Sequence, residues 1–92
     1  MKISTRFSDS IHILAFINIY QGIIPLTSNN IASSIETSPV VVRRLMSALN
    51  KAGLINTVHG PAELALAKSP ENISLYDIFL AIEGAAHLFT ID

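Results

Sequence analysis

The chain has 92 residues, of which half are apolar and 14% are charged, and its formal net charge at pH 7 is −1. A chain of this size and composition folds as one domain with a modest core, which excludes intrinsic disorder and leaves no room for a cofactor domain beside a substrate domain. Cysteine is absent, and this excludes disulfides, thiolate nucleophiles and cysteine-bound zinc or iron–sulfur clusters.

The charges are unevenly distributed along the chain. All six cations lie in residues 1–68 together with three acids, whereas residues 69–92 carry four acids and no cation. This polarity is compatible with a phosphate-binding face on the first part of the chain, although an even spread over the folded surface would give the same counts.

The first predicted helix covers residues 5–20. Apolar residues occupy nearly all of its faces, which indicates a central helix, and Gly22 and Pro25 end it. The most apolar run, residues 11–26, is interrupted by polar residues and is too short to span a bilayer. No small-x-small cleavage site follows it, so neither a membrane span nor a secretory signal is expected, and a cytoplasmic protein is predicted.

Two shorter helices follow, joined by a tight turn. Thr27 or Ser28 can cap the second helix, whose apolar stripe is Ile31, Ala32 and Ile35. The residues that follow this stripe, 36–37, form the turn. The two helices are therefore expected to pack as a helix-turn-helix pair.

The third predicted helix covers residues 38–52. Ser38 caps it, Pro39 takes its first position and Gly53 ends it. Four apolar residues recur at helical spacing and are expected to face the core: Val42, Leu45, Met46 and Leu49. Arg43 and Arg44 then face outward.

After Gly53 the pattern changes from helical to alternating. Residues 54–58 and 64–67 alternate around a turn that contains Gly60 and Pro61, which predicts a short β-hairpin. A fourth helix is predicted from Ser74 to Gly84, with an approximate capping box made by Ser74 and Asp77. The predicted fold is mainly α with a small β-hairpin, in the order of a winged helix-turn-helix.

The paired arginines near the start of the third helix indicate a function. Cations in that position are mildly unfavourable for an isolated helix, whose first turn favours acids. A recognition helix enters the DNA major groove with its N-terminal residues foremost, and guanidinium groups there suit guanine edges or phosphate oxygens. Val40 and Val41 can contact thymine methyls. A solvated arginine pair is the simpler reading of the residues alone, but the topology favours DNA.

The segment SPVVVRRLMSALNKAGLI, preceded by NNIASSIET and followed by SPENISLYDIFLAIEG, resembles the Rrf2 family of bacterial winged-helix transcription regulators, which includes the iron–sulfur cluster regulator and the cysteine metabolism repressor. The likeness runs from Lys2 to about Gly84. It implies sequence-specific binding of double-stranded DNA as a homodimer, usually as a repressor, with helix 38–52 in the major groove. Residues 1–84 would form the DNA-binding domain and residues 85–92 the start of a dimerisation segment, in a fragment or a short member of the family.

The resemblance implies four groups of DNA-contacting residues. The N-terminal stretch contributes Lys2, Ser4, Thr5 and Arg6, which match a segment that touches phosphate, and Ser28 begins the second helix. The recognition helix contributes Ser38, Val40, Val41, Arg43 and Arg44, and the wing contributes His59 and Gly60.

The sequence departs from the family in the wing and in the sensor region. The family's wing is commonly R-G-P-x-G-G-Y, whereas this chain has His59 in place of the arginine and lacks the double glycine. Minor-groove contact by the wing is therefore not expected to be strong. Sensor members hold an iron–sulfur cluster with three cysteines beyond the fourth helix, and without them no cluster-based signal is predicted.

No enzyme, metal site or cofactor is predicted. His12, His59 and His87 share no metal-ligand spacing, and no nucleophile motif of the G-x-S-x-G or S-x-x-K type is present. A small-molecule effector between the fourth helix and the body is conceivable, but no residue identifies it.

Two alternatives stay open at this stage. The chain could be a winged-helix module that binds protein through Val40, Val41 and the wing, having lost DNA contact. The apolar end of the chain, formed by Phe79, Leu80, Ile82, Leu88, Phe89 and Ile91, could pack in the core or form part of a dimer interface.

Overall fold

The structure is a computed structural model that describes residues 5–56 and 64–84. Its helices are α1 (Thr5–Tyr20), α2 (Ser28–Ile35), α3 (Pro39–Lys51) and α4 (Leu75–Phe79), and its strands are β1 (Ile55–Asn56) and β2 (Ala65–Leu66). A 3-10 turn (Pro70–Asn72) precedes α4 and a π-helical turn (Leu80–Gly84) continues it. Three helices followed by a two-stranded hairpin and a further helix confirm the predicted winged helix-turn-helix fold.

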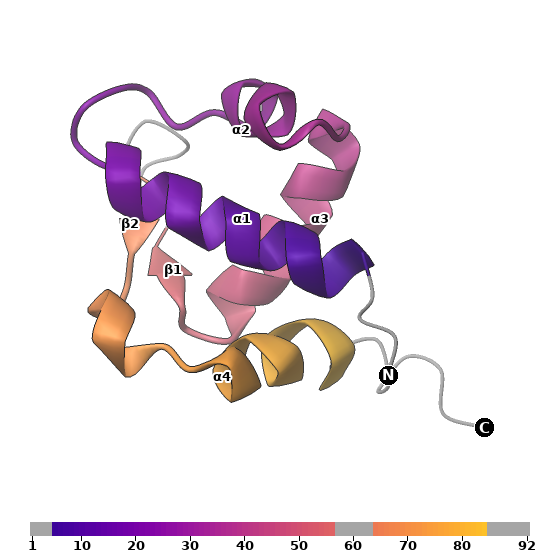
Figure 1. Ribbon diagram of the computed structural model, residues 1–92, viewed down its shortest axis with the longest axis vertical. Coiled ribbons are helices and arrows are strands. Elements are labelled where there is room, and N and C mark those ends of the chain that lie inside the picture. The colour runs from indigo at the N-terminus through magenta and orange to yellow at the C-terminus, as the bar shows by residue number, and fades with distance from the viewer. Residues whose placement is uncertain (1–4, 57–63, 85–92) are drawn as a thin grey trace.

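Helix α1 is the central element of this arrangement. Figure 1 shows it crossing the middle of the molecule in front of α3, with α2 above it and α4 below it. Four of its residues are buried at helical spacing, namely Ser10, Ile13, Leu14 and Ile17. The buried Ser10 hydroxyl donates to the Arg6 carbonyl at 2.7 Å, which satisfies its hydrogen-bonding need. The prediction of a central first helix is therefore confirmed.

The turn between α2 and α3 is made by two capped helix ends. Thr27, rather than Ser28, caps α2, because its Oγ1 accepts the Asn30 N–H at 3.0 Å. Glu36 is the C-cap of α2, and its backbone has φ 59° and ψ 50°. This left-handed conformation is unfavourable for a residue with a Cβ, and it turns the chain sharply into α3.

Helix α3 begins and ends as the sequence predicts. The Ser38 Oγ accepts the Val41 N–H at 3.2 Å, and Pro39 takes the first position. Gly53 adopts φ 79°, with Gly53 N–H donating to Asn50 O and Leu54 N–H to Leu49 O, both at 3.0 Å. This pair of bonds is a Schellman motif. The four residues expected to face the core are all buried: Val42, Leu45, Met46 and Leu49.

The hairpin is antiparallel, with Ile55 opposite Leu66 and Asn56 opposite Ala65. The predicted hairpin is confirmed, although only two residues of each strand pair within the described ranges. The side chain of Gln21, just after α1, covers the outer edge of β2, because its Oε1 accepts the Leu66 N–H at 3.0 Å. The tip of the wing, with His59 and Gly60, lies outside the described residues.

The fourth helix starts with the predicted capping box. Ser74 Oγ accepts the Asp77 N–H and the Asp77 carboxylate accepts the Ser74 N–H, each at 3.0 Å. The bond from the Ser74 N–H, with a smaller attraction from Lys68, lowers the pKa of Asp77. The helix runs to Gly84 as expected, and its winding changes from α-helical to π-helical at Leu80.

Candidate nucleic-acid interface

The outward face of α3 carries one stripe of cationic and small side chains. Exposed residues follow one another at helical spacing on the side opposite the core: Val40, Arg43, Arg44, Ser47 and Lys51. Val40 is 49% exposed, which is high for a valine of a packed helix. The prediction that both arginines are displayed is therefore confirmed.

The charge of this stripe is not neutralised by the rest of the described chain. The ion pair found among residues 5–56 and 64–84 joins Arg6 to Glu83, and neither Arg43 nor Arg44 takes part in it. The first turn of α3 also contains no acid. The positive end of the helix dipole and two guanidinium groups thus lie together at one end of α3, which suits an anionic partner.

The other predicted residues of α3 contribute unequally. Ser38 is exposed, and its hydroxyl proton stays available because the Oγ acts as acceptor in the cap. Val41 is half-buried and packs against the core, so its side chain offers little surface to a partner. Apolar contact by α3 therefore depends mainly on Val40.

The structure describes some of the predicted residues outside α3. Thr5 begins α1 and is exposed, and Ser28 is the half-buried first residue of α2. Arg6 is exposed at the start of α1, where its guanidinium pairs with Glu83. Lys2 and Ser4 lie outside the described residues, as do His59 and Gly60.

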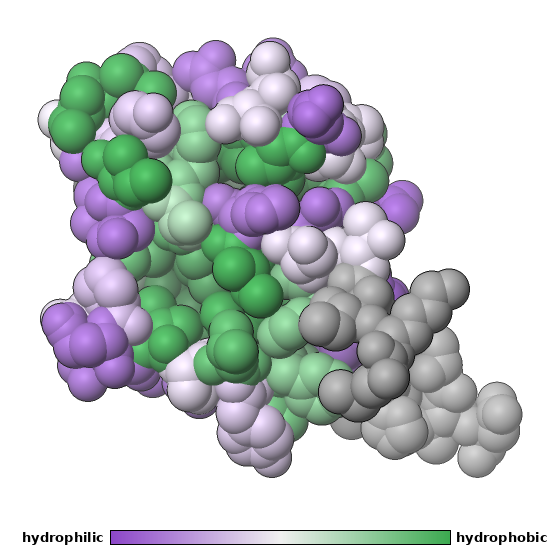
Figure 2. Space-filling view, in the orientation of Figure 1, coloured by the Kyte–Doolittle hydropathy of each residue, from purple (hydrophilic) through white to green (hydrophobic). Residues whose placement is uncertain are grey.

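Exposed apolar residues gather away from the α3 stripe. Figure 2 shows the face that α1 crosses, with hydrophobic residues over the loop after α1, where Ile23 and Ile24 are exposed. The described residues at the apolar end of the chain differ in burial. Ile82 is buried in the core, whereas Phe79 and Leu80 are each about half exposed. The predicted residues Leu88, Phe89 and Ile91 lie outside the described ranges.

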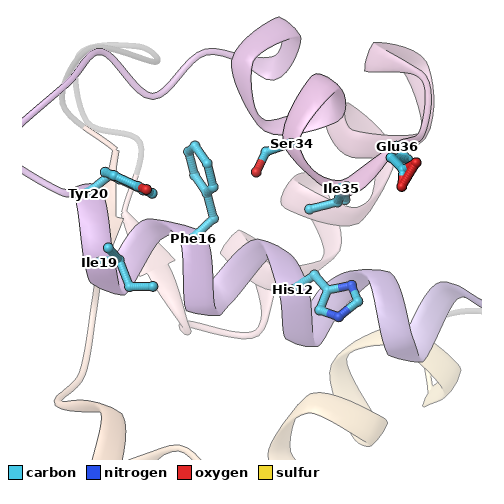
Figure 3. Close-up of a pocket in the computed structure, with 7 residues that line it drawn as sticks. All are labelled: His12, Phe16, Ile19, Tyr20, Ser34, Ile35 and Glu36. Atoms are coloured by element: carbon cyan, nitrogen blue, oxygen red, sulfur yellow. The ribbon is translucent and has the colours of Figure 1, made fainter.

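Two surface hollows flank α1. Figure 3 shows a groove of about 380 Å³ between α1 and α2. Phe16 and Tyr20 line one end of this groove, and His12 and Glu36 line the opposite end. A hollow of about 150 Å³ between α1, β2 and α4 is lined mostly by apolar side chains, with Asn18 as a polar one. Neither lining identifies a ligand.

Within the described ranges, no three His, Asp or Glu side chains lie close enough to hold a metal ion. His12 is exposed on α1. No helix in the part of the chain that the structure describes is long and apolar enough to cross a membrane.

Comparison with known proteins points to one family. A family model described as Rrf2, iron-dependent transcriptional regulator, matches residues 3–92. The chain is 36% identical over 89 residues to YwnA of Bacillus subtilis (strain 168), which carries the name of an HTH-type transcriptional regulator. It is 29% identical over 90 residues to YffB of Lactococcus lactis, which is named in the same way.

Solved structures of the same fold include two regulators. The B. subtilis global cysteine regulator CymR matches with a TM-score of 0.79 and 28% identity over 91% of this chain. IscR of T. potens matches with a TM-score of 0.80 and 28% identity over 92% of this chain. The chain spans 65% and 58% of the two curated relatives, and 66% and 63% of these two structures.

The description of the family model names iron, which proteins hold with converging thiolate, imidazole or carboxylate ligands. The 92 residues contain no cysteine, and residues 5–56 and 64–84 contain no cluster of metal-ligating side chains. The donors of these described residues do not fit an iron or iron–sulfur centre, because such centres are held by thiolates or by converging His and carboxylate groups.

Proposed function

Because the chain belongs to the Rrf2 family of transcriptional regulators, we propose that it binds double-stranded DNA in a sequence-specific manner as a homodimer and represses transcription. The observation that carries the proposal is the exposed pair Arg43 and Arg44, which no carboxylate among the described residues neutralises, at the dipole-positive end of α3. Helix α3 is the second helix of the helix-turn-helix pair, which is the one that enters the major groove in this fold.

In this proposal the residues of α3 divide between base and backbone contacts. Arg43 and Arg44 reach guanine edges or phosphates through their paired N–H donors, and Val40 meets a thymine methyl. Ser38 and the free amides at the start of α3 bind a phosphate and fix the helix in the groove. The packed position of Val41 makes it a support for the helix rather than a contact.

The flanking residues bind the backbone. Thr5 and Arg6 lie at the exposed start of α1, and we assign Lys2 and Ser4 to the same phosphate-binding stretch. Ser28 at the start of α2 offers an amide or hydroxyl to a phosphate on the other side of α3. His59 and Gly60 of the wing contribute little, because the arginine that would enter the minor groove is absent.

The proposal also includes the homodimer, the cellular location and the effector. Residues 1–84 act as the DNA-binding domain, and a second copy joins through the segment that starts at residue 85. The protein acts in the cytoplasm and is not an enzyme, in keeping with relatives that are named as regulators. Any effector is a small molecule that the described hollows do not identify.

A binding titration tests the proposal. Fluorescence anisotropy with a duplex from the chain's own upstream region should show tighter binding than with a scrambled duplex of equal length and composition. Raising the salt should weaken it, because each phosphate contact contributes a slope of about −0.9 in log affinity against log salt. The double variant Arg43→Ala, Arg44→Ala should bind at least about tenfold more weakly, since a good arginine–guanine pair contributes about 1–3 kcal/mol.

Lys51→Ala is the matched control for this titration. Lys51 is an exposed cation at the other end of α3, so its removal changes the charge without touching the proposed contact. It should lower the affinity no more than a few-fold. Wild-type affinity in the double arginine variant would count against DNA recognition by α3.

Two observations favour a second candidate function, a winged-helix module that binds protein. Val40 is 49% exposed and the chain's net charge is −1, both of which suit a protein surface better than DNA. This alternative would be supported by two results together: a protein partner whose binding affinity hardly changes with salt, and no binding of DNA.

A further inference from the structure

The start of α1 is held by a carboxylate from the far end of the described chain. Arg6 Nη2 donates to Glu83 Oε1 at 3.1 Å, across 77 positions of sequence, and the two side chains are 55% and 22% exposed. Beside this pair, the rings of Phe7 and Phe79 meet edge to face with centroids 6.3 Å apart. Figure 1 shows the start of α1 and the end of the π-helical turn on the same side of the molecule.

We propose that Glu83 is an intramolecular competitor of DNA for Arg6. The inference rests on the proposed function and goes beyond it, because it assigns to an acidic residue the task of limiting affinity. A carboxylate and a phosphate offer the guanidinium fork the same kind of anionic oxygens, so they are alternative partners for Arg6. When a phosphate approaches, Glu83 must either release Arg6 or stay as a negative charge close to the DNA backbone.

The exposure of the pair makes this competition effective. An ion pair that is more than half exposed on one side stabilises the fold by at most about 1 kcal/mol, so DNA can displace the carboxylate. The same exposure leaves the guanidinium reachable from solvent. Glu83 therefore weakens the contact between Arg6 and a DNA phosphate but does not prevent it.

The ion pair with Glu83 involves only one part of the proposed DNA interface. Arg6 is paired, whereas Arg43 and Arg44 take no part in an ion pair among the described residues. Arg6 lies in the stretch assigned to the phosphate backbone, and backbone contacts carry affinity without sequence information. Glu83 is therefore expected to lower affinity for all sequences equally and to leave the preference between sequences unchanged.

The variant Glu83→Gln in the full chain tests the inference by anisotropy on the specific and scrambled duplexes. Binding to both should become about two- to fivefold tighter at low salt, as for the release of one exposed ion pair. Between about 50 and about 200 mM salt its affinity should fall up to about three- to fourfold more than that of the wild type, because completing the weakened Arg6–phosphate contact adds up to about 0.9 to the slope. The ratio of the two affinities should stay the same.

Two control variants separate this mechanism from a general effect of charge. Glu71→Gln makes the same charge change on the exposed 3-10 turn, which precedes α4, whereas the π-helical turn that carries Glu83 follows it. It should change the affinity less than twofold. In a background that carries Arg6→Gln, the gain from Glu83→Gln should disappear, because the guanidinium that it releases is gone. Thermal unfolding of each variant checks that it is folded.

Each other outcome overturns the inference. It fails if Glu83→Gln binds no tighter than the wild type, if Glu71→Gln tightens binding equally, or if the gain persists without Arg6. If the wild type binds and the Arg43→Ala, Arg44→Ala variant does not, a silent Glu83→Gln refutes the competition alone. If the wild type binds no duplex at all, the proposed function and this inference fall together.

Discussion

Replacing Ser38 by alanine tests how the start of the recognition helix is held. The Ser38 Oγ accepts the Val41 N–H at 3.2 Å, while the Val42 N–H already donates to the Ser38 carbonyl at 3.1 Å. Removing the hydroxyl leaves the Val41 amide without its partner. The loss of such a cap costs about 1 kcal/mol, which lowers the Tm of a domain of this size by about 4–8 °C.

Ser47 provides a matched control on the same helix. Its side chain is exposed in the interior of α3, so Ser47→Ala removes the same hydroxyl where no helix end depends on it. Alanine is the better helix former at such a position, and the variant should gain about 0.5 kcal/mol. One chemical change thus has opposite signs at two positions nine residues apart in the sequence.

Urea unfolding followed by far-UV circular dichroism measures both variants against the wild type. Ser38→Asp extends the test, because aspartate keeps the cap but adds a negative charge where we place a DNA phosphate. It should unfold near the wild-type midpoint and bind DNA more weakly. Wild-type stability in Ser38→Ala, or an equal loss in Ser47→Ala, would refute the reasoning about the cap.

Three further predictions concern the core, the turn and the fourth helix. Leu49→Ala should lower the free energy of unfolding in urea by about 2–5 kcal/mol, because Leu49 is fully buried. Glu36→Gly should raise it by about 0.5–1 kcal/mol, since glycine adopts the left-handed conformation without the Cβ penalty but makes the unfolded chain more flexible. The capping box should stabilise the fold above the ordinary aspartate pKa of about 3.9 and lose this effect as the pH falls through the lowered folded-state pKa of Asp77. Unfolding midpoints of wild type and Asp77→Asn across acid pH should converge at the lowest values.

The outcomes that would contradict these predictions are equally direct. A Leu49→Ala loss below about 1 kcal/mol would mean that α3 packs less tightly than its burial indicates. Destabilisation by Glu36→Gly would mean that the Glu36 side chain supports the turn. If the unfolding midpoints of wild type and Asp77→Asn differed by the same amount over the whole acid range, the Asp77 carboxylate would not be stabilising the capping box.

Features set by neighbouring residues were predictable from the sequence. Ser38, Pro39 and Gly53 mark the ends of α3 because caps and left-handed residues act within one turn of the chain. The inward and outward faces of α3 follow from helical spacing alone, which is why Arg43 and Arg44 could be placed at the surface. The same reasoning located the Ser74–Asp77 capping box.

Features that depend on distant parts of the chain could not be predicted. The contact between Arg6 and Glu83 spans 77 positions, and no local pattern links an exposed arginine to one acid among several. The π-helical turn could not be predicted from the sequence for another reason. Ile78, Ala81 and Ile82 are buried at a spacing that an α-helix also gives, so the apolar pattern does not distinguish the two windings. The half-buried position of Val41 likewise depends on the neighbours that α3 meets.

Selection of bound duplexes from random-sequence DNA tests the central claim most directly, since it reads out both binding and sequence preference. The account predicts enrichment of a two-fold symmetric motif with half-sites about 10 bp apart, or a multiple of this. The Arg43→Ala, Arg44→Ala variant should lose preference at particular positions of that motif. No enrichment with the wild-type chain, or the same motif recovered with equal strength by the double variant, would contradict recognition of DNA through α3.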